Sequence, residues 1–313
     1  MAIPMKSKKS KTVLVTGANG LLGQKLIEQL KGKEEYRLLA SGLGGCRLPE
    51  HWKGFDWVSM DVTDLYRVKE VFEEYKPDVV IHTAAMTQVD DCENQREEAV
   101  RQNVDAVRNL VEVCGFYNTH LIHLSTDFIF DGQAGPYEED TEPNPVNFYG
   151  ETKLEAEKLI MASSIPWSIV RTVLVYGIAQ DLSRSNIILW VKNSLEAGKT
   201  IQVVNDQWRT PTLAEDLAQG CILVMEKEAL GVFNISGKDF LTPYDMALMT
   251  AEFFRLDKNL IKEVNSRVFT QPARRPLRTG FVLDKAFKEL DYRPKSFMEG
   301  IGILAKQLNL PIH

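Results

Sequence analysis

Short apolar runs alternate with longer amphipathic stretches over the first two-thirds of this chain. The short runs are continuously apolar over four or five residues, as is typical of strands buried on both faces of a sheet, and they lie at residues 12–16, 37–41, 78–82, 120–124 and 167–171. Apolar residues recur at helical spacing between these runs, at residues 21–30, 65–75 and 99–117. This alternation predicts a parallel sheet with right-handed crossovers, and hence an α/β, doubly wound fold of the Rossmann type.

The pattern loosens after about Tyr176. Helical spacing persists at residues 186–197 and 243–254, but polar loops that contain proline join these stretches. We therefore expect a Rossmann domain over residues 11–175 and a smaller C-terminal part over residues 176–313. A basic run at the N-terminus predicts a disordered tail over residues 1–10.

Composition narrows the classes of function. The chain has 313 residues, of which 44% are apolar and 26% charged, as expected for a globular protein with a sizeable core. A net charge of -6 argues against a nucleic-acid partner, which would require a positive surface. The sequence shows neither a membrane-spanning run nor the apolar core of a secretion signal. The four cysteines form no C-x-x-C pair, so we expect reduced thiols, a cytoplasmic location and no metal site.

A glycine-rich turn follows the first predicted strand. Gly17, Gly20 and Gly23 have the spacing G-x-x-G-x-x-G and open the first predicted helix. Glycine permits the tight turn and the approach of a pyrophosphate to the backbone, and the helix N-terminus attracts phosphates. The place of this motif between a strand and a helix favours an NAD(P)-binding domain over a purely structural turn.

The end of the second strand helps to predict which dinucleotide binds. Folds selective for NAD place an Asp or Glu there, to bind the ribose hydroxyls. Here the strand ends at Ser41 and continues into Gly-Leu-Gly-Gly without an acid, and Arg47 lies nearby. We therefore favour NADPH and leave NADH open. Asp61 and Val62 follow the next strand and are placed for the adenine, although capping of the following helix is an alternative role for Asp61.

Tyr149 and Lys153 form the candidate catalytic pair. Residues four apart on a helix face the same side, so the phenol and the ammonium can meet in one site. An ordinary tyrosine has a pKa of roughly 10, and a nearby cation is expected to lower that pKa. Ser125-Thr126-Asp127 stands at the carboxyl end of a central strand, where open α/β sheets bind ligands. A hydroxyl there can polarise a substrate carbonyl, so Thr126 is the third candidate.

Together with Thr83-Ala84-Ala85, these motifs resemble an extended short-chain dehydrogenase/reductase. Three further stretches, at residues 125–132, 203–212 and 274–276, narrow the resemblance to the dTDP-4-dehydrorhamnose reductase family. The similarity runs from about Lys11 to the C-terminus. It implies NADPH- or NADH-dependent reduction of the 4-keto group of a nucleotide-activated 6-deoxysugar, in the biosynthesis of dTDP-L-rhamnose.

The resemblance also implies roles for single residues. Tyr149 would donate the proton, and Lys153 would bind the nicotinamide ribose. Thr126, Asp127 and Tyr149 would contact the sugar, and residues 176–313 would form most of the substrate-binding part. Asn103 would support the site from a helix. The implied cofactor-binding residues are Gly17, Asn19, Gly20, Leu21, Leu22, Gly23, Asp61, Val62, Ala84, Ala85, Met86 and Lys153.

The chain departs from the family at one position of the expected substrate site. The family usually has Arg-Thr-Ser-Trp-Val-Tyr, in which the tryptophan lines the sugar, whereas this chain has Leu174 at that place. Leu174 is therefore a candidate substrate-binding residue without a stacking surface, and the identity of the sugar stays open. The sequence after Arg275-Pro276 also differs from the usual pattern.

Three hypotheses follow from these residues. The first is the 4-keto reductase, with a nucleotide sugar as partner, no nucleic acid or membrane partner, and a homodimer allowed. The second is another sugar-nucleotide reductase or an epimerase on the same scaffold. The third is a dinucleotide-binding regulatory subunit, because residues 103–105 and 173–177 resemble the β subunit of methionine adenosyltransferase.

Overall fold

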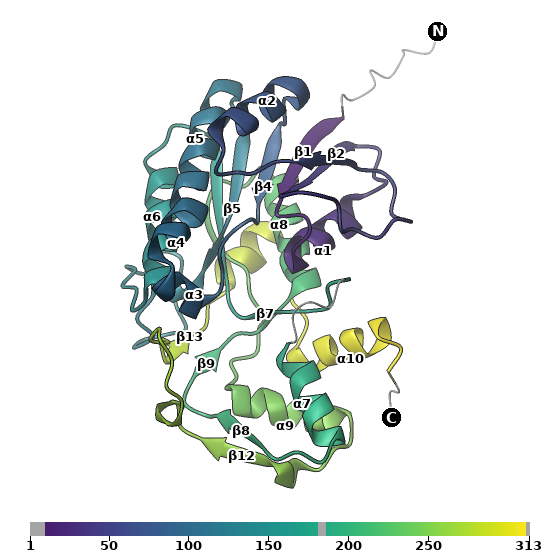
Figure 1. Ribbon diagram of the computed structural model, residues 1–313, viewed down its shortest axis with the longest axis vertical. Helices are drawn as coiled ribbons and strands as arrows, with labels where there is room; N and C mark the ends of the chain where they lie inside the picture. The colour runs from purple at the N-terminus through teal and green to yellow at the C-terminus, as the bar shows by residue number, and fades with distance from the viewer. Residues whose placement is uncertain (1–9, 181–185, 311–313) are drawn as a thin grey trace.

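A seven-stranded parallel sheet forms the centre of the protein, as a computed structural model that describes residues 10–180 and 186–310 shows (Figure 1). The tail expected over residues 1–10 lies almost wholly outside the described residues. The strand order is β11-β6-β5-β4-β1-β2-β3, which confirms the predicted doubly wound fold. The strands are β1 (Lys11–Thr16), β2 (Tyr36–Gly42), β3 (Asp56–Ser59), β4 (Val79–His82), β5 (His120–Thr126), β6 (Trp167–Thr172) and β11 (Gly231–Asn234).

Helices cover both faces of this sheet because successive strand residues point to opposite sides. Val13 and Val15 of β1 pack toward α1 (Leu21–Leu30) and α8 (Ala214–Glu226). Leu14 packs on the other side, where the apolar faces of three helices complete a second core. These helices are α2 (Leu65–Tyr75), α5 (Ala106–Tyr117) and α6 (Phe148–Met161). Figure 1 shows the two helical layers on either side of the sheet.

The predicted helix at residues 99–117 is interrupted. A short helix α4 (Arg96–Val100) passes into a π-helical turn at Arg101–Asp105 before α5 begins, and α3 (Val89–Asn94) precedes them. The wider turn inserts a residue into the helical repeat, so that the buried Asn103 side chain lies toward the sheet. Helical spacing alone does not reveal such a turn, because the apolar pattern continues through it.

The chain crosses more than once between the sheet and the C-terminal part. Strand β11 and helix α8 both come from residues beyond 176, yet they complete the edge and one face of the sheet. The expected division between residues 175 and 176 therefore does not coincide with the edge of the sheet. Strand β11 lies at the edge of the sheet because it pairs with β6, which is distant in the sequence. No local sequence pattern predicts this pairing.

Apart from α8 and β11, the described residues of the C-terminal part form short parallel strand pairs and the helices α7, α9 and α10, which lie beyond the carboxyl ends of the sheet strands (Figure 1). Both helices expected here from the spacing are present as α7 and α9, and Asn186 and Thr242 cap them. No helix among the described residues is long and apolar enough to cross a membrane. The elements are β7 (Val175–Tyr176), α7 (Ile187–Glu196), β8 (Ile201–Val204), β9 (Trp208–Arg209), β10 (Thr212–Leu213), α9 (Pro243–Phe253), β12 (Ile261–Val264), β13 (Arg278–Thr279) and α10 (Phe297–Gln307).

A buried ion pair fastens α6 to β6. The Arg171 guanidinium donates to both carboxylate oxygens of Glu157, at 3.0 and 2.7 Å, and also to the Glu139 carbonyl at 2.9 Å. Neither side chain of the pair has more than a few per cent of its surface exposed. Burial of two charges is costly, and removal of one partner leaves the other as an uncompensated buried charge.

Replacement of Arg171 by methionine should lower the free energy of unfolding by about 3 to 5 kcal/mol, because Glu157 would remain buried without its partner. Denaturant unfolding measures this loss. The matched control is Lys258→Met, which breaks the exposed pair with Glu252 and should change the free energy of unfolding far less, because solvent screens both charges. Equal losses in the two variants would contradict a structural role for the buried pair.

Candidate active site

The glycine turn lies between the ends of β1 and β4. Gly17 has a φ of +66°, which L side chains rarely adopt, and a β-carbon there would lie 2.7 Å from the Ala84 backbone nitrogen. Gly20 is the N-cap of α1, and among the described residues no side chain caps that helix end. The backbone N–H groups of Leu21 and Leu22 therefore open the helix without a side-chain acceptor, as phosphate binding requires.

Asn19 fastens the loop after β2 to this turn. Its amide nitrogen donates to the Gly45 carbonyl at 3.0 Å, and its amide oxygen accepts from the Arg47 backbone nitrogen at 2.9 Å. Asn19 thus holds the loop after β2 against the glycine turn and brings the Arg47 backbone to the edge of that turn. The sequence had marked both residues, but it could not show that they contact one another.

Asp61 is not the cap of helix α2. Asp64 fills that role by accepting from the backbone nitrogens of Tyr66 and Arg67. Asp61 instead accepts from the backbone nitrogen and hydroxyl of Thr63, at 2.9 and 2.8 Å. The helix-cap alternative for Asp61 is therefore wrong, and its expected contact with the adenine stays a prediction.

Asn103 supports the segment that follows β4. Its side chain accepts from the Met86 backbone nitrogen at 2.9 Å and donates to the Met86 carbonyl at 3.1 Å. The same amide group lies 3.1 Å from the Thr152 hydroxyl, which in turn donates to the Tyr149 carbonyl at 2.8 Å. The π-helical turn thus links Met86 with helix α6, which carries the candidate catalytic pair.

Helix α6 approaches the end of β5 closely. Asn147 caps the helix by accepting from the Gly150 backbone nitrogen at 2.9 Å. A β-carbon on Gly150 would lie 2.1 Å from the Phe128 carbonyl oxygen, so only glycine allows this approach. The approach places the neighbouring Tyr149 within hydrogen-bonding distance of Thr126.

Tyr149 and Lys153 lie one turn apart on α6 and are both buried, with 9% and 3% of their surfaces exposed. Burial raises the pKa of Tyr149 above its ordinary value, and the hydrogen bond with Thr126 only partly opposes this. The expectation that a nearby cation lowers the Tyr149 pKa is therefore wrong for this structure. Burial also lowers the pKa of Lys153 to about 8. The phenol stays protonated at neutral pH, and a protonated phenol can serve as an acid.

Asp127 is held by residues from the C-terminal part. Its carboxylate accepts from the hydroxyls of Thr126, at 3.1 Å, and of Thr279 on β13, and the Arg209 guanidinium on β9 lies 3.9 Å away. Only 3% of Asp127 is exposed, and burial raises its pKa to about 6. Thr126 thus connects Asp127 with the neighbouring Tyr149, whose raised pKa its side chain partly lowers. The contact of Asp127 with a sugar stays a prediction, since both its oxygens have partners.

Leu174 lies two residues beyond Thr172, the β6 partner of Thr126. It has a φ of +34° and 45% of its surface is exposed. A leucine on left-handed backbone is uncommon. Its exposed side chain offers an apolar contact but lacks the stacking surface of an aromatic ring.

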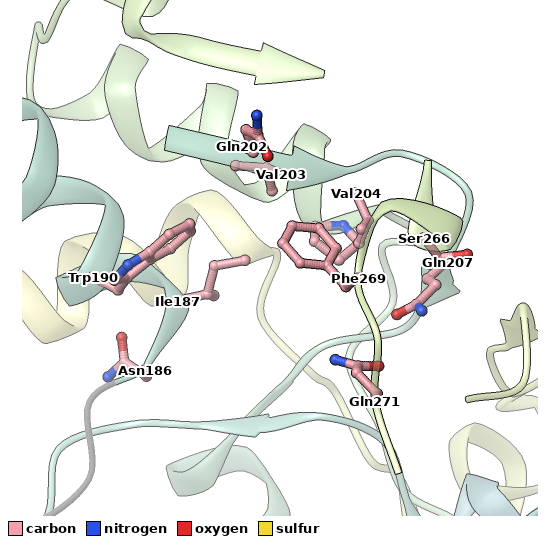
Figure 2. A pocket seen from close by; sticks show the side chains of 11 residues that line it. Asn186, Ile187, Trp190, Gln202, Val203, Val204, Gln207, Ser266, Phe269 and Gln271 are labelled. Atoms are coloured by element: carbon pink, nitrogen blue, oxygen red, sulfur yellow. The ribbon is translucent and has the colours of Figure 1, made fainter. Parts of the chain in front are cut away.

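A pocket of about 490 Å³ lies in the C-terminal part, between α7, β8 and residues 266–271 (Figure 2). In Figure 2 the rings of Trp190 and Phe269 lie on either side of Ile187. The sequence analysis did not predict this pocket or the contact of Arg209 with Asp127. The signal for them was the stretch at residues 203–212, which resembles the dTDP-4-dehydrorhamnose reductase family. The lining residues are Asn186, Ile187, Trp190, Gln202, Val203, Val204, Gln207, Pro243, Ser266, Phe269 and Gln271.

Comparisons with known proteins agree with this geometry. The model of a family described as "RmlD substrate binding domain" matches residues 11–310. Among solved structures, a dTDP-4-dehydrorhamnose reductase from Clostridium acetobutylicum is 29% identical, with a TM-score of 0.82 over 96% of this chain and 100% of that one. The enzyme of the same name from Bacillus anthracis, solved in complex with NADP, is 25% identical, with a TM-score of 0.82 over 95% and 99%.

Two curated relatives point in different directions. Methionine adenosyltransferase 2 subunit beta from Xenopus tropicalis is 31% identical over 256 residues, which cover 80% of this chain and 74% of the relative. A protein of Haloferax volcanii named "Probable low-salt glycan biosynthesis reductase Agl14" is 34% identical over 267 residues, which cover 85% and 87%. Similarity alone thus includes both an enzyme and a subunit of another enzyme.

The raised pKa of Asp127 predicts a specific dependence of stability on pH. Between about pH 4 and pH 6 the folded protein binds more protons at this group than the unfolded chain does, so stability falls as pH rises through that window. The free energy of unfolding of wild type should decrease by up to about 3 kcal/mol relative to Asp127→Asn across the window. Denaturant unfolding of both proteins at several pH values measures this difference, and parallel pH curves would rule the effect out.

Proposed function

This chain belongs to the RmlD substrate binding domain family, and from that premise we propose that it reduces the 4-keto group of a nucleotide-activated 6-deoxysugar with NADPH or NADH. The resemblance to extended short-chain reductases, and to dTDP-4-dehydrorhamnose reductase in particular, is confirmed. Synthesis of dTDP-L-rhamnose is the specific reaction sequence that we propose for it.

The observation that carries this proposal is the Tyr149 phenol, which is buried beside Thr126 and one turn from Lys153 at the carboxyl edge of the sheet. A bound reduced nicotinamide supplies the hydride for the carbonyl carbon. Tyr149 donates its proton to the carbonyl oxygen, which balances the reduction to an alcohol. The buried Lys153 ammonium remains nearby and stabilises the phenolate that the transfer leaves. Thr126 lies beside Tyr149, where its hydroxyl is placed to polarise the substrate carbonyl.

The residues around the glycine turn fit a dinucleotide. Gly17 lets the turn pack against Thr83 and Ala84, and the N-terminus of α1, which no described side chain caps, opens at the same turn. We assign the pyrophosphate to this turn, the adenine to Asp61 and Val62, and the nicotinamide ribose to Lys153. The loop held by Asn19 carries Arg47 and no acid at the end of β2, which favours NADPH.

The C-terminal pocket suits the nucleotide end of the substrate. Its aromatic rings offer a stacking surface, and the amides of Gln202, Gln207 and Gln271 offer both donors and acceptors for the edge of a base. The sugar would then extend toward Tyr149 and Leu174. Because Leu174 brings no ring to the sugar, its identity must be found by experiment.

A screen of nucleotide-linked 4-keto sugars tests the proposal. Oxidation of NADPH or NADH is followed by absorbance, with dTDP-4-dehydrorhamnose as the first substrate. Turnover of one such sugar supports the reductase and identifies the sugar. The absence of oxidation with every member of the panel would overturn it.

Replacement of Tyr149 by phenylalanine should reduce turnover by a factor of about 10² or more, because the proton donor is lost. NADPH affinity, measured by nicotinamide fluorescence, should change little, since the ring keeps its packing against Phe128. Tyr36→Phe is the control, because Tyr36 begins β2 at the opposite end of the sheet. Equal rates for Tyr149→Phe and wild type would remove Tyr149 from the donor role.

A second candidate function is a dinucleotide-binding regulatory subunit. The relatives named as methionine adenosyltransferase 2 subunit beta favour it. Copurification with a catalytic subunit of methionine adenosyltransferase, together with no turnover of any keto sugar, would support this role. An intact and active Tyr149–Lys153 pair would favour the reductase.

A further inference from the structure

A row of polar side chains crosses three neighbouring strands beneath the catalytic helix. Thr16 of β1 pairs in register with His82 of β4, which pairs with His123 of β5. These residues continue the rows that begin with Leu14, so they face the helix layer that contains α6. All three are almost completely buried. The row therefore replaces apolar core at the carboxyl end of the sheet, directly under Lys153.

Lys153 is the end of this row. Its ammonium nitrogen lies 3.1 Å from His123 Nε2 and donates to the Leu124 carbonyl at 2.7 Å. The His82 and His123 rings stack with centroids 5.3 Å apart, and His82 Nδ1 lies 2.7 Å from the Thr16 hydroxyl. A continuous chain of contacts thus joins the residue before the glycine turn to the catalytic lysine.

The chemistry of the pair assigns its donor and acceptor. An ammonium group only donates, so His123 Nε2 must accept and the neutral ring carries its proton on Nδ1. Burial, and then Lys153, lower the pKa of His123 well below its ordinary value, so the ring remains an acceptor at neutral pH. Burial likewise lowers the pKa of His82, to about 3.

Two ring nitrogens of this row are costly for a purely structural core. Among the described residues, His123 Nδ1 and His82 Nε2 have no hydrogen-bond partner although both atoms are buried. An apolar side chain would avoid that penalty, as Leu14 does in the same row of β1. The cost of burying these two imidazoles points to a function for them. The contact that His123 offers and an apolar side chain could not is the hydrogen-bond acceptor for Lys153.

We propose that His123 is a positioning residue, whose neutral imidazole accepts from Lys153 and holds the ammonium in place and charged beside Tyr149. His82 and Thr16 support the ring by stacking and by a hydrogen bond. The consequence for turnover rests on the proposed reductase function, whereas the contact between His123 and Lys153 can be tested without any sugar substrate.

Other groups also act on the charge of Lys153. Glu157 lies one turn further along α6, Cys92 faces it from α3, and Tyr149 precedes it by one turn. Glu157 and Cys92 favour the charged lysine, while burial disfavours it. Because none of these groups changes when His123 is replaced, a change in the Lys153 pKa reports the histidine contact.

The test compares His123→Met with His123→Gln, which have similar shapes but differ in the strength of the acceptor. Lysine side chains labelled with ¹³C at Cε are titrated by NMR in the full chain, and Lys153→Met assigns the Lys153 signal. Starting from a pKa of about 8, the methionine variant should bind the Lys153 proton at least tenfold more weakly. The glutamine variant should restore most of this affinity, and NADPH binding should weaken only in the methionine variant.

His120→Met is the matched control. His120 is another buried histidine of β5, but its Nε2 contacts the Ser168 hydroxyl, at 2.7 Å, and not Lys153. This variant should lower the melting temperature without a change in the Lys153 titration. An unchanged Lys153 titration in His123→Met would overturn the proposal, even if that variant were less stable.

If the His123 variants do not fold, a measurement on the unmodified protein still tests the proposal. The ¹⁵N chemical shifts of His123 should show a neutral ring protonated at Nδ1 throughout the neutral pH range. A ring protonated at Nε2 could not accept from Lys153, and it would overturn the proposal. If the sugar screen fails but the His123 ring is protonated at Nδ1, the proposed reductase function is incorrect while the contact between His123 and Lys153 stands.

Discussion

The site depends on the close packing of α6 against the carboxyl end of β5. Gly150 permits an approach that a single β-carbon would prevent, and Asn147 fixes the first turn of the helix at that place. Tyr149 is thereby held beside Thr126, and Lys153, one turn later, reaches the Leu124 carbonyl. The buried pair between Glu157 and Arg171 holds the following turn of the same helix on β6. A small shift of α6 would therefore disturb all of these contacts together.

Burial determines the protonation states of Tyr149 and Lys153, the proposed catalytic pair. It raises the pKa of Tyr149 and lowers the pKa of Lys153, so that the phenol is protonated while the lysine has only a moderate preference for its charged form. A protonated phenol suits proton donation to a carbonyl, which is the reductive direction. The Thr126 hydroxyl donates to Asp127 and lies beside Tyr149, so it connects the carboxylate with the phenol. The apparent conflict with the usual effect of a nearby cation is resolved by the larger cost of removing the phenolate from water.

The C-terminal part contributes to the site in two ways, through direct contacts with Asp127 and through a separate pocket. Arg209 and Thr279 reach Asp127 directly, so the state of that carboxylate depends on both parts of the chain. The pocket around Trp190 and Phe269 lies within the C-terminal part itself and offers room for a nucleotide. This pocket is separate from the glycine turn, and the reductase proposal gives it a use as the site of the substrate's nucleotide.

The sequence by itself determined the features that depend on neighbouring residues. Strand and helix alternation predicted the sheet, the glycine spacing predicted the turn, and the four-residue spacing of Tyr149 and Lys153 predicted one shared face. Only the tertiary structure decided the return of β11 to the sheet, the partners of Asp127 and the acceptor that His123 offers to Lys153. It also decided the direction of the pKa shift of Tyr149. These outcomes depend on burial and on partners far apart along the chain, which local periodicity does not encode.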